Sequence, residues 1–367
     1  MKILKKTFTD KLLLISLAVA VITLIVGRPR NSDIDWRTIG SLFALMIMVQ
    51  SFQFLGVFQF IADNLTYKIV NTRLLIQILI LIAFFSSMIL TNDVAIITLI
   101  PLLKISIKQT KVAPELPVIL LCLAANLGSI LLPIGNPQNL FLFVHYNLSF
   151  INFLKMALPI CLLSFILLES LTYLIKPQPL VQQKLGLNKL NSKKVWIAGI
   201  SSLIVLLSIL KLIPLTIGIL IAIISALIIS PQIFGNVDYS LLLTFICFFV
   251  AVSNISHADI LVNSLKSIGN NAIEVYFSSI GLSQFLSNVP TAILFAPFTK
   301  KSYALFLGTN IGGLGTLVAS LANLLAYKQY KLNFKRQNKH YLIKFTGLNV
   351  LMLLILGFLG CLLIILY

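Results

Sequence analysis

One stretch of the chain occurs twice, and this duplication constrains the fold more than any other feature. The first copy reads SMILTNDVAIITLIP from Ser87 to Pro101, and the second reads SQFLSNVPTAILFAP from Ser283 to Pro297. Serine, leucine, asparagine, isoleucine and proline recur in register, and Thr91 matches Ser287, another small hydroxyl. Chance similarity is the alternative, since apolar stretches share a small alphabet. The shared asparagine and proline positions favour two related halves.

A second pair of polar motifs follows the two copies in the same order. Each motif is an asparagine with a glycine two positions later, followed at an equal spacing by another asparagine. The residues are Asn126, Gly128 and Asn139 after the first copy, and Asn310, Gly312 and Asn323 after the second. Amides and glycines that recur inside apolar sequence strengthen the assignment of two repeats.

Long apolar runs, separated by short loops that carry lysines, make up the rest of the chain. Hydrophobic residues account for 59% of the sequence and charged residues for 10%, which is typical of an all-α integral membrane protein embedded in a lipid bilayer. A net charge of +18 on a soluble domain would suggest a nucleic-acid partner. Here the basic residues cluster in loops, where they orient a membrane protein, so no nucleic acid is expected. The four cysteines lie singly in apolar runs and lack metal-ligand spacing, so no metal site or cofactor is expected.

Each repeat contains an apolar segment interrupted by polar residues. Residues 74–103 would form a helix of about 45 Å, too long for one crossing and too short for two. The segment therefore predicts a re-entrant hairpin with Thr91-Asn92-Asp93 at its tip, and a strongly tilted single helix is the alternative. Residues 272–300 predict the second hairpin, with its tip at Ser287-Asn288-Val289-Pro290.

Each hairpin is followed by a segment that cannot remain regular helix. Residues 117–144 contain Gly135-Asn136-Pro137, and residues 303–327 contain several glycines. Proline and glycine in the middle of a membrane segment predict a discontinuous transmembrane helix.

Counting crossings predicts that the two repeats are inverted. The first repeat (1–175) crosses four times, and a basic cytoplasmic linker with its helix (176–210) adds a fifth crossing. Because five is odd, the second repeat (211–367) enters upside down. With a cytoplasmic N-terminus, most of the 28 lysines and arginines fall on the inner side. The predicted topology of the chain therefore has about nine membrane crossings plus two hairpins.

Interrupted helices are tolerated inside a membrane where they line a cavity or bind something. Helix N-termini suit an anion, freed carbonyls suit Na⁺, and asparagine serves either role without a buried charge. The alternative for each amide is a hydrogen bond that packs two helices. The candidate substrate- and ion-binding residues are Thr91, Asn92, Asp93, Asn126, Gly128, Gly135, Asn136, Pro137, Asn139, Ser287, Asn288, Pro290, Thr291, Asn310, Gly312, Gly313 and Asn323.

Asp93 is the acid at a predicted hairpin tip, and the second repeat has Val289 in its place. An intramembrane acid is a functional candidate by default, so Asp93 could couple transport to H⁺ or Na⁺. It could equally cap the second arm of the hairpin by accepting backbone N–H bonds.

The stretches LTNDVAIITLIPL, PIGNPQNL, SQFLSNVPTAIL and GTNIGGLGTLVASLANLLAY resemble the ion-transporter superfamily. That superfamily includes citrate and dicarboxylate transporters, arsenite permeases and a class of Na⁺/H⁺ antiporters. The likeness covers both halves and looks most like the shorter citrate-transporter-like anion permeases. In the dicarboxylate branch, Ser-Asn-Thr tips bind Na⁺ and substrate carboxylates; here Asp93 and Val289 replace the final threonine. The resemblance also implies elevator-type alternating access and a homodimer.

These observations together predict a secondary active transporter of the cell (inner) membrane. It would move a small anionic substrate, coupled to H⁺ or Na⁺ and without any other cofactor. A Na⁺/H⁺ antiporter or an arsenite/oxyanion exporter of the same superfamily is the alternative, and an intramembrane enzyme or assembly factor is a more distant one. The sequence contains no HExxH, GxSxG or CxxC motif and no clustered acids, which argues against an enzyme.

Overall fold

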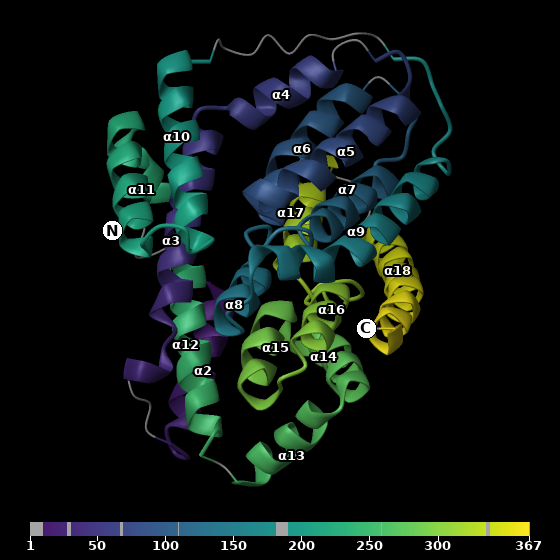
Figure 1. Ribbon diagram of the computed structural model, residues 1–367. Helices are drawn as coiled ribbons and strands as arrows, with labels where there is room; N and C mark the ends of the chain where they lie inside the picture. The colour runs from purple at the N-terminus through teal and green to yellow at the C-terminus, as the bar shows by residue number, and fades with distance from the viewer. Residues whose placement is uncertain are drawn as a thin grey trace.

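A computed structural model shows a helical protein (Figure 1). It describes residues 10–27, 31–66, 69–108, 110–180, 190–257, 259–334 and 338–366, and no strand occurs in those ranges beyond one isolated bridge between Asn71 and Pro179. The α-helices of the first half are α2 (Lys11–Thr23), α3 (Trp36–Phe54), α4 (Val57–Thr66), α5 (Thr72–Leu90), α6 (Asn92–Ile107), α7 (Glu115–Gly128), α8 (Pro137–His145) and α9 (Phe150–Thr172). Those that follow are α10 (Ser192–Ile209), α11 (Leu215–Ile229), α12 (Tyr239–Ile255), α13 (Asp259–Asn270), α14 (Ala272–Leu286), α15 (Asn288–Phe295), α16 (Ser302–Gly312), α17 (Leu321–Phe334) and α18 (Asn338–Leu366). The predicted all-α membrane fold is confirmed.

Both predicted hairpins form, and both turn at the predicted tips. α5 and α6 meet at Thr91, and α14 and α15 meet at Ser287. These two residues have φ values of 72° and 78°, a region that non-glycine residues rarely adopt. The hairpin of α5 and α6 lies in the upper half of the molecule and that of α14 and α15 in the lower half (Figure 1). The two hairpins therefore enter from opposite sides, as inverted repeats require.

Both predicted broken helices are also present. α7 ends at Gly128 and α8 begins at Pro137, whose fixed φ suits the first turn of a helix. α16 ends at Gly312 and α17 begins at Leu321. The breaks are therefore residues 129–136 and 313–320.

Two helices, α4 and α13, were not predicted. Gly56, at φ +69°, ends α3 and redirects the chain into α4. α13 lies between α12 and the second hairpin. Both are amphipathic and too short to span a bilayer, so a search for long apolar runs passes over them. α4 lies at the top of the molecule and α13 at the bottom (Figure 1).

Four helices in the described part of the chain are long and apolar enough to cross a membrane by themselves. They are Thr72–Leu90, Phe150–Thr172, Ser192–Ile209 and Lys339–Leu366. The first of these is an arm of a hairpin, because the chain turns back at Thr91. The other predicted crossings are made by α3, which is less apolar, by shorter helices, or by two helices joined at a break.

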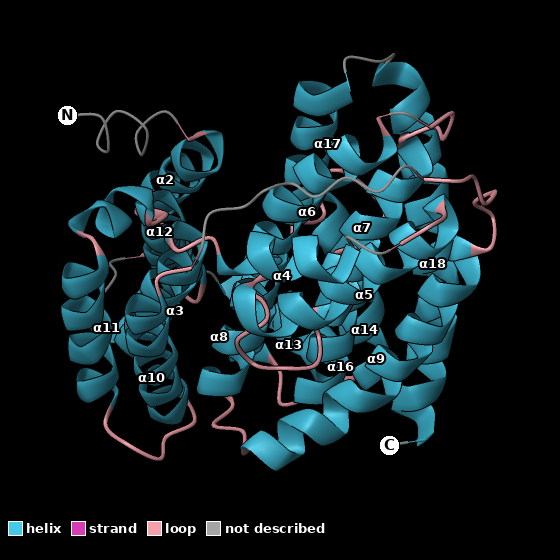
Figure 2. Ribbon diagram, turned by 90° about the horizontal axis from the view of Figure 1, so that it is seen from above, coloured by secondary structure: helices cyan, strands magenta, loops and turns pink. Residues whose placement is uncertain are grey.

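The helices separate into two groups when seen from above (Figure 2). We call α2, α3, α10, α11 and α12 the lateral bundle, and α5 to α9 with α14 to α18 the core bundle. α4 connects α3 to the first hairpin, and α13 connects α12 to the second. Each bundle contains helices from both predicted repeats. The division of the chain into repeats therefore differs from the division of the structure into bundles.

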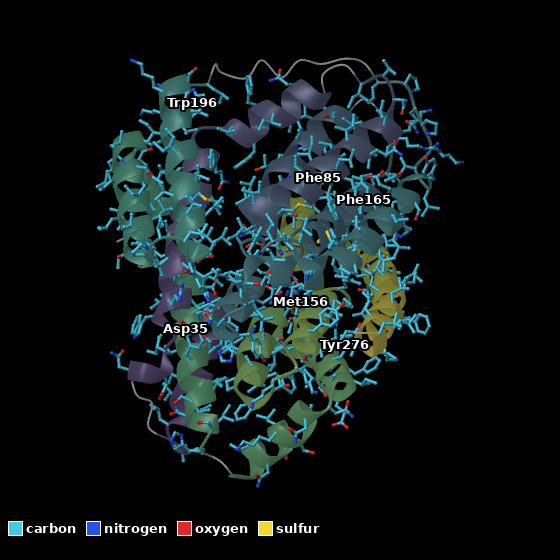
Figure 3. All side chains as sticks on the ribbon, viewed as in Figure 1. Asp35, Phe85, Met156, Phe165, Trp196 and Tyr276 are labelled. Atoms are coloured by element: carbon cyan, nitrogen blue, oxygen red, sulfur yellow. The ribbon has the colours of Figure 1, made fainter. Side chains whose placement is uncertain are left out.

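Aromatic packing and polar contacts hold the long helices of the core bundle against one another. Phe85 on α5 lies beside Phe165 on α9, with ring centroids 6.0 Å apart (Figure 3). Tyr276 on α14 is fully buried, and its hydroxyl donates to the Gly357 carbonyl on α18 at 2.8 Å. Lipid tails are as apolar as phenylalanine, so close packing and hydrogen bonds, rather than the hydrophobic effect, stabilise such contacts in a bilayer.

The charge distribution predicts which end of the molecule faces the cytoplasm, and cysteine labelling can test it. Ser192, at the start of α10, and Ser256, just before α13, are exposed. The start of α10 and α13 lie at opposite ends of the molecule (Figure 1). In a cysteine-free background, Ser192→Cys is expected to resist an impermeant maleimide applied to intact cells, whereas Ser256→Cys should react. Strong labelling of Ser192→Cys from outside would refute the predicted orientation.

Candidate functional site

The two hairpin tips present helix N-termini that no side chain caps. α6 begins at Asn92 and α15 at Asn288, and the residue before each helix makes no side-chain capping hydrogen bond to the described backbone. One backbone group is satisfied across the fold, since the Asn288 N–H donates to the Ala319 carbonyl in the second break at 3.0 Å. The residues before these helices, Thr91 and Ser287, keep a backbone conformation that costs about 1–3 kcal/mol each, which is common at functional sites.

Four asparagines join the two broken helices across the repeats. The Asn126 side-chain amide donates to Oδ1 of Asn323 at 2.8 Å, and the Asn310 amide donates to Oδ1 of Asn139 at 2.7 Å. Asn126 matches Asn310 in the repeat, and Asn139 matches Asn323, so this is one contact made twice about a pseudo-two-fold axis. We call these four residues the asparagine clasp. All four are buried, and in this contact they act as helix-packing groups.

The clasp also satisfies the backbone of the breaks. The Asn139 amide donates to the carbonyls of Ser129 and Ile130, both at 3.3 Å. In the second repeat, the Asn323 amide donates to the carbonyls of Gly313 at 3.0 Å and Thr316 at 2.8 Å. Carbonyls freed by a helix break are costly in a membrane unless they are paired, so these amides stabilise the two interruptions.

Two further asparagines connect the clasp to its surroundings. Asn92 at the first tip donates to Oδ1 of Asn126 at 3.0 Å. Asn136 caps α8 by accepting from the Asn139 N–H at 2.9 Å, and its amide donates to Asn310 at 3.2 Å. The first hairpin tip and both breaks therefore form one hydrogen-bonded unit.

A small cavity of about 30 Å³ lies where the two tips meet the second halves of the broken helices. This is enough space for a water molecule or a small ion. First-turn residues of four helices, α6, α8, α15 and α17, contribute to its wall, and no lysine, arginine or histidine of the described chain does. Its polar lining residues are Asn92, Asp93, Gln138, Thr244, Ser287, Asn288 and Ser320.

A larger vestibule of about 620 Å³ adjoins this cavity and lies between the lateral and core bundles. The two spaces share Asp93, Pro137 and Thr244 in their walls. Three of the ten acids of the chain, Asp10, Asp93 and Asp238, line the vestibule together with Lys328. In the orientation predicted from the charge distribution, Asp10 and Lys328 belong to the cytoplasmic side, so the vestibule is expected to open to the cytoplasm.

Comparison with known proteins identifies the family of the chain. The family model described as "Citrate transporter" matches residues 9–304.

The chain belongs to the citrate transporter family.

Similar proteins include an inner membrane protein and two transporters. The chain is 29% identical over 325 residues to an inner membrane protein, YbiR, of Escherichia coli, covering 88% of this chain and 87% of that protein. It is 33% identical over 334 residues to an uncharacterized transporter of Methanocaldococcus jannaschii, covering 86% and 88%. A silicon efflux transporter of Oryza sativa is 31% identical over 129 residues, which is 35% of this chain and 26% of that protein.

A solved structure shares the fold. The YdaH transporter of Alcanivorax borkumensis, whose topology is described as unusual, superposes with a TM-score of 0.56 over 88% of this chain and 83% of that one, at 14% identity. Together with the family match, this makes the protein a membrane transporter of the citrate transporter family.

In this citrate transporter family member, Asp93 does not cap its helix. Within the described residues, its carboxylate makes no hydrogen bond and no ion pair; the half-buried side chain lies instead at the wall shared by the cavity and the vestibule. A capping role requires bonds from backbone N–H groups to the carboxylate. The geometry therefore argues against the capping role and leaves Asp93 as a titratable group that faces the cavity and the vestibule.

Several predicted site residues serve close packing. A Cβ at Gly128 would lie 2.1 Å from the Phe84 carbonyl oxygen, and one at Gly135 would lie 2.2 Å from the Ser129 carbonyl oxygen. A Cβ at Gly312 would lie 2.9 Å from Ser283, and one at Gly313 would lie 2.9 Å from Asn288, which is less close but still tighter than ordinary contact. The Thr291 hydroxyl donates to the Ser287 carbonyl of its own hairpin at 2.8 Å. Thr91, Asn136, Pro137 and Pro290 line the vestibule or the cavity.

Sequence reasoning missed three polar residues of the cavity wall, Gln138, Thr244 and Ser320. Gln138 stands inside the PIGNPQNL motif, and Ser320 immediately precedes α17, so their positions beside a break were available signals. Thr244 lies in the apolar helix α12, and no feature of the sequence distinguishes it from the other hydroxyl residues of that helix.

Proposed function

We propose that this transporter moves a small anion by secondary active transport, coupled to H⁺ or Na⁺. The observation that carries the proposal is the meeting of four helix N-termini, two from each repeat, at one cavity whose described wall contains no basic side chain. Helix N-termini carry partial positive charge and free N–H groups, so they hold an anion without a buried lysine or arginine.

The arrangement of the bundles supports elevator-type movement. The described polar groups of the site come mostly from the core bundle, and the vestibule lies between that bundle and the lateral bundle. α4 and α13 connect the lateral bundle to the two hairpins at opposite ends of the molecule. Rigid-body displacement of one bundle against the other is a common means of alternating access in transporters with inverted repeats.

A neutral or singly charged oxyacid is a second candidate substrate. The cavity is small, and Asp93 in its wall would repel a multivalent anion such as citrate. Two relatives, aligned over about a quarter of their own lengths, bear the names silicon efflux transporter and putative transporter arsB. An exporter of small oxyacids therefore fits the same geometry.

Transport into proteoliposomes tests both candidates. The protein is reconstituted, and accumulation of radiolabelled citrate, phosphate and arsenite is followed under an imposed Na⁺ or pH gradient, with protein-free liposomes as the control. Gradient-dependent accumulation of citrate or phosphate supports the anion proposal, and movement of arsenite alone supports the oxyacid candidate. Movement of none of the three by correctly folded protein would contradict both.

Asp93→Asn tests the coupling role of the acid. The substitution preserves size and much of the hydrogen-bonding capacity but removes the titratable group. We expect the variant to lose accumulation driven by a pH or Na⁺ gradient while it still exchanges substrate across the membrane. Undiminished gradient-driven accumulation would show that Asp93 does not couple transport.

A further inference from the structure

The hydroxyls of Thr244 and Ser279 depart from the pattern of most buried serines and threonines in the described helices. Ser51, Ser164 and Thr309 each donate to the carbonyl four residues earlier in their own helix, at 2.7–2.8 Å. This is the ordinary way in which a hydroxyl is satisfied inside an apolar helix. Thr244 is only 1% exposed, yet its Oγ1 has no hydrogen-bond partner among the described residues. A buried hydroxyl without a partner carries a free-energy cost, so this position calls for a functional explanation.

The place of Thr244 supplies that explanation. Its side chain lines both the small cavity and the vestibule. The other described residues that the lateral bundle contributes to the small cavity, Leu12, Leu241 and Phe248, are apolar. Every other polar group of the cavity wall comes from the core bundle. Among the described residues, Thr244 is therefore the one polar group through which the lateral bundle can contact an ion held at the hairpin tips.

We propose that the Thr244 hydroxyl donates a hydrogen bond to the transported oxyanion while the site faces the vestibule. This inference rests on the proposed function, namely anion transport by movement of the core bundle. When the core bundle carries the tips away from α12, the bond to Thr244 breaks, while the contacts supplied by the tips and breaks travel with the ion. The site therefore binds the anion more tightly when it faces the vestibule than when it faces the opposite side of the membrane.

Thr244→Val removes the hydroxyl and preserves the shape of the side chain. Loss of a hydrogen bond to a charged ligand lowers affinity about ten- to a hundredfold. The apparent KM for uptake is measured in inside-out and right-side-out membrane vesicles, with whichever of radiolabelled citrate, phosphate or arsenite the native protein accumulates. We expect the KM to rise about ten- to a hundredfold in inside-out vesicles, where the vestibule side is exposed, and to stay unchanged in right-side-out vesicles.

Two matched variants separate binding from packing. Thr244→Ser retains the hydroxyl and should restore the native KM on both sides. Ser279→Ala removes another buried hydroxyl that lacks a partner but lines neither the cavity nor the vestibule, and it should leave the KM unchanged. An unchanged KM on both sides, an equal rise on both sides, or the same rise in Ser279→Ala would overturn the inference.

A labelling measurement covers the case in which Thr244→Val does not reach the membrane. In a cysteine-free background, Thr244→Cys should react with an impermeant methanethiosulfonate in inside-out vesicles only, and the transported probe should slow the reaction. Reaction from the opposite side, or a rate that the probe does not change, would also overturn the inference. If the native protein accumulates none of the three probes, the proposed function itself fails; if it does so and Thr244→Val behaves as native, only the role of Thr244 fails.

Discussion

Asn92→Ala and Asn288→Ala are each expected to lower the apparent affinity for substrate about ten- to a hundredfold. Both residues begin a hairpin-tip helix and line the small cavity. Loss of a hydrogen bond to a charged ligand costs about 1.5–3 kcal/mol, which corresponds to that range of affinity. The measurement is the concentration dependence of uptake into proteoliposomes, at matched amounts of reconstituted protein.

A control is needed because Asn92 also has a structural bond, to Asn126. Asn349→Ala provides it, since Asn349 is equally buried but lies in α18, where its amide donates to the Phe345 carbonyl at 3.0 Å. This variant should transport with native affinity. If Asn92→Ala and Asn288→Ala both kept native affinity, the two amides would be helix-packing groups only.

Gly128→Ala is expected to destabilise the protein by at least about 3 kcal/mol, the upper end of the usual cost of overpacking. The new methyl group would lie 2.1 Å from the carbonyl oxygen of Phe84 and 2.7 Å from its Cα. These are backbone atoms of α5, so no side-chain rotation can relieve the clash. Either the first hairpin or the first break must shift, and the thermal unfolding midpoint of the detergent-solubilised protein should fall sharply.

Gly199→Ala is the matched control for this substitution. Gly199 lies within α10, and no atom lies within 4 Å of a Cβ placed there. Alanine has the higher helix propensity, so the variant should unfold at the native temperature or slightly above it. If Gly128→Ala and Gly199→Ala had the same thermal unfolding midpoint, the close approach of α7 to α5 would be contradicted.

The sequence allowed the interruptions of the fold to be predicted because each has a local chemical cause. Proline and glycine cannot continue a helix at the breaks, and an Asn beside a small hydroxyl is poorly accommodated inside a long apolar run. Tips at Thr91 and Ser287 followed directly, and the inverted order followed from counting crossings. α4 and α13 were missed because their apolar residues face one side only and never form a long run.

The pairing of the polar groups could not be predicted, because it depends on contacts between distant segments. Nothing local to Asn126 indicates that its partner is Asn323 in the other repeat. The same holds for Thr244, whose significance comes from the cavity that other helices bring to it. Asp93 lies between these cases: its exceptional position was visible in the sequence, but two roles stayed open until the structure showed its carboxylate without capping bonds.

The asparagine clasp has a consequence for the order in which the protein is completed during synthesis. The side-chain oxygen of Asn139 can form its bond only after Asn310 has been synthesised. The side-chain amide of Asn126 can form its bond only after Asn323, which the ribosome adds nearly two hundred residues later. Chains begin to fold from the N-terminus as they emerge, so the first broken helix enters the bilayer before its partners exist. The first half of the protein therefore lacks these hydrogen-bond partners until the second half has been made. The second half then supplies them, as one protomer supplies the contacts of the other in a symmetric dimer.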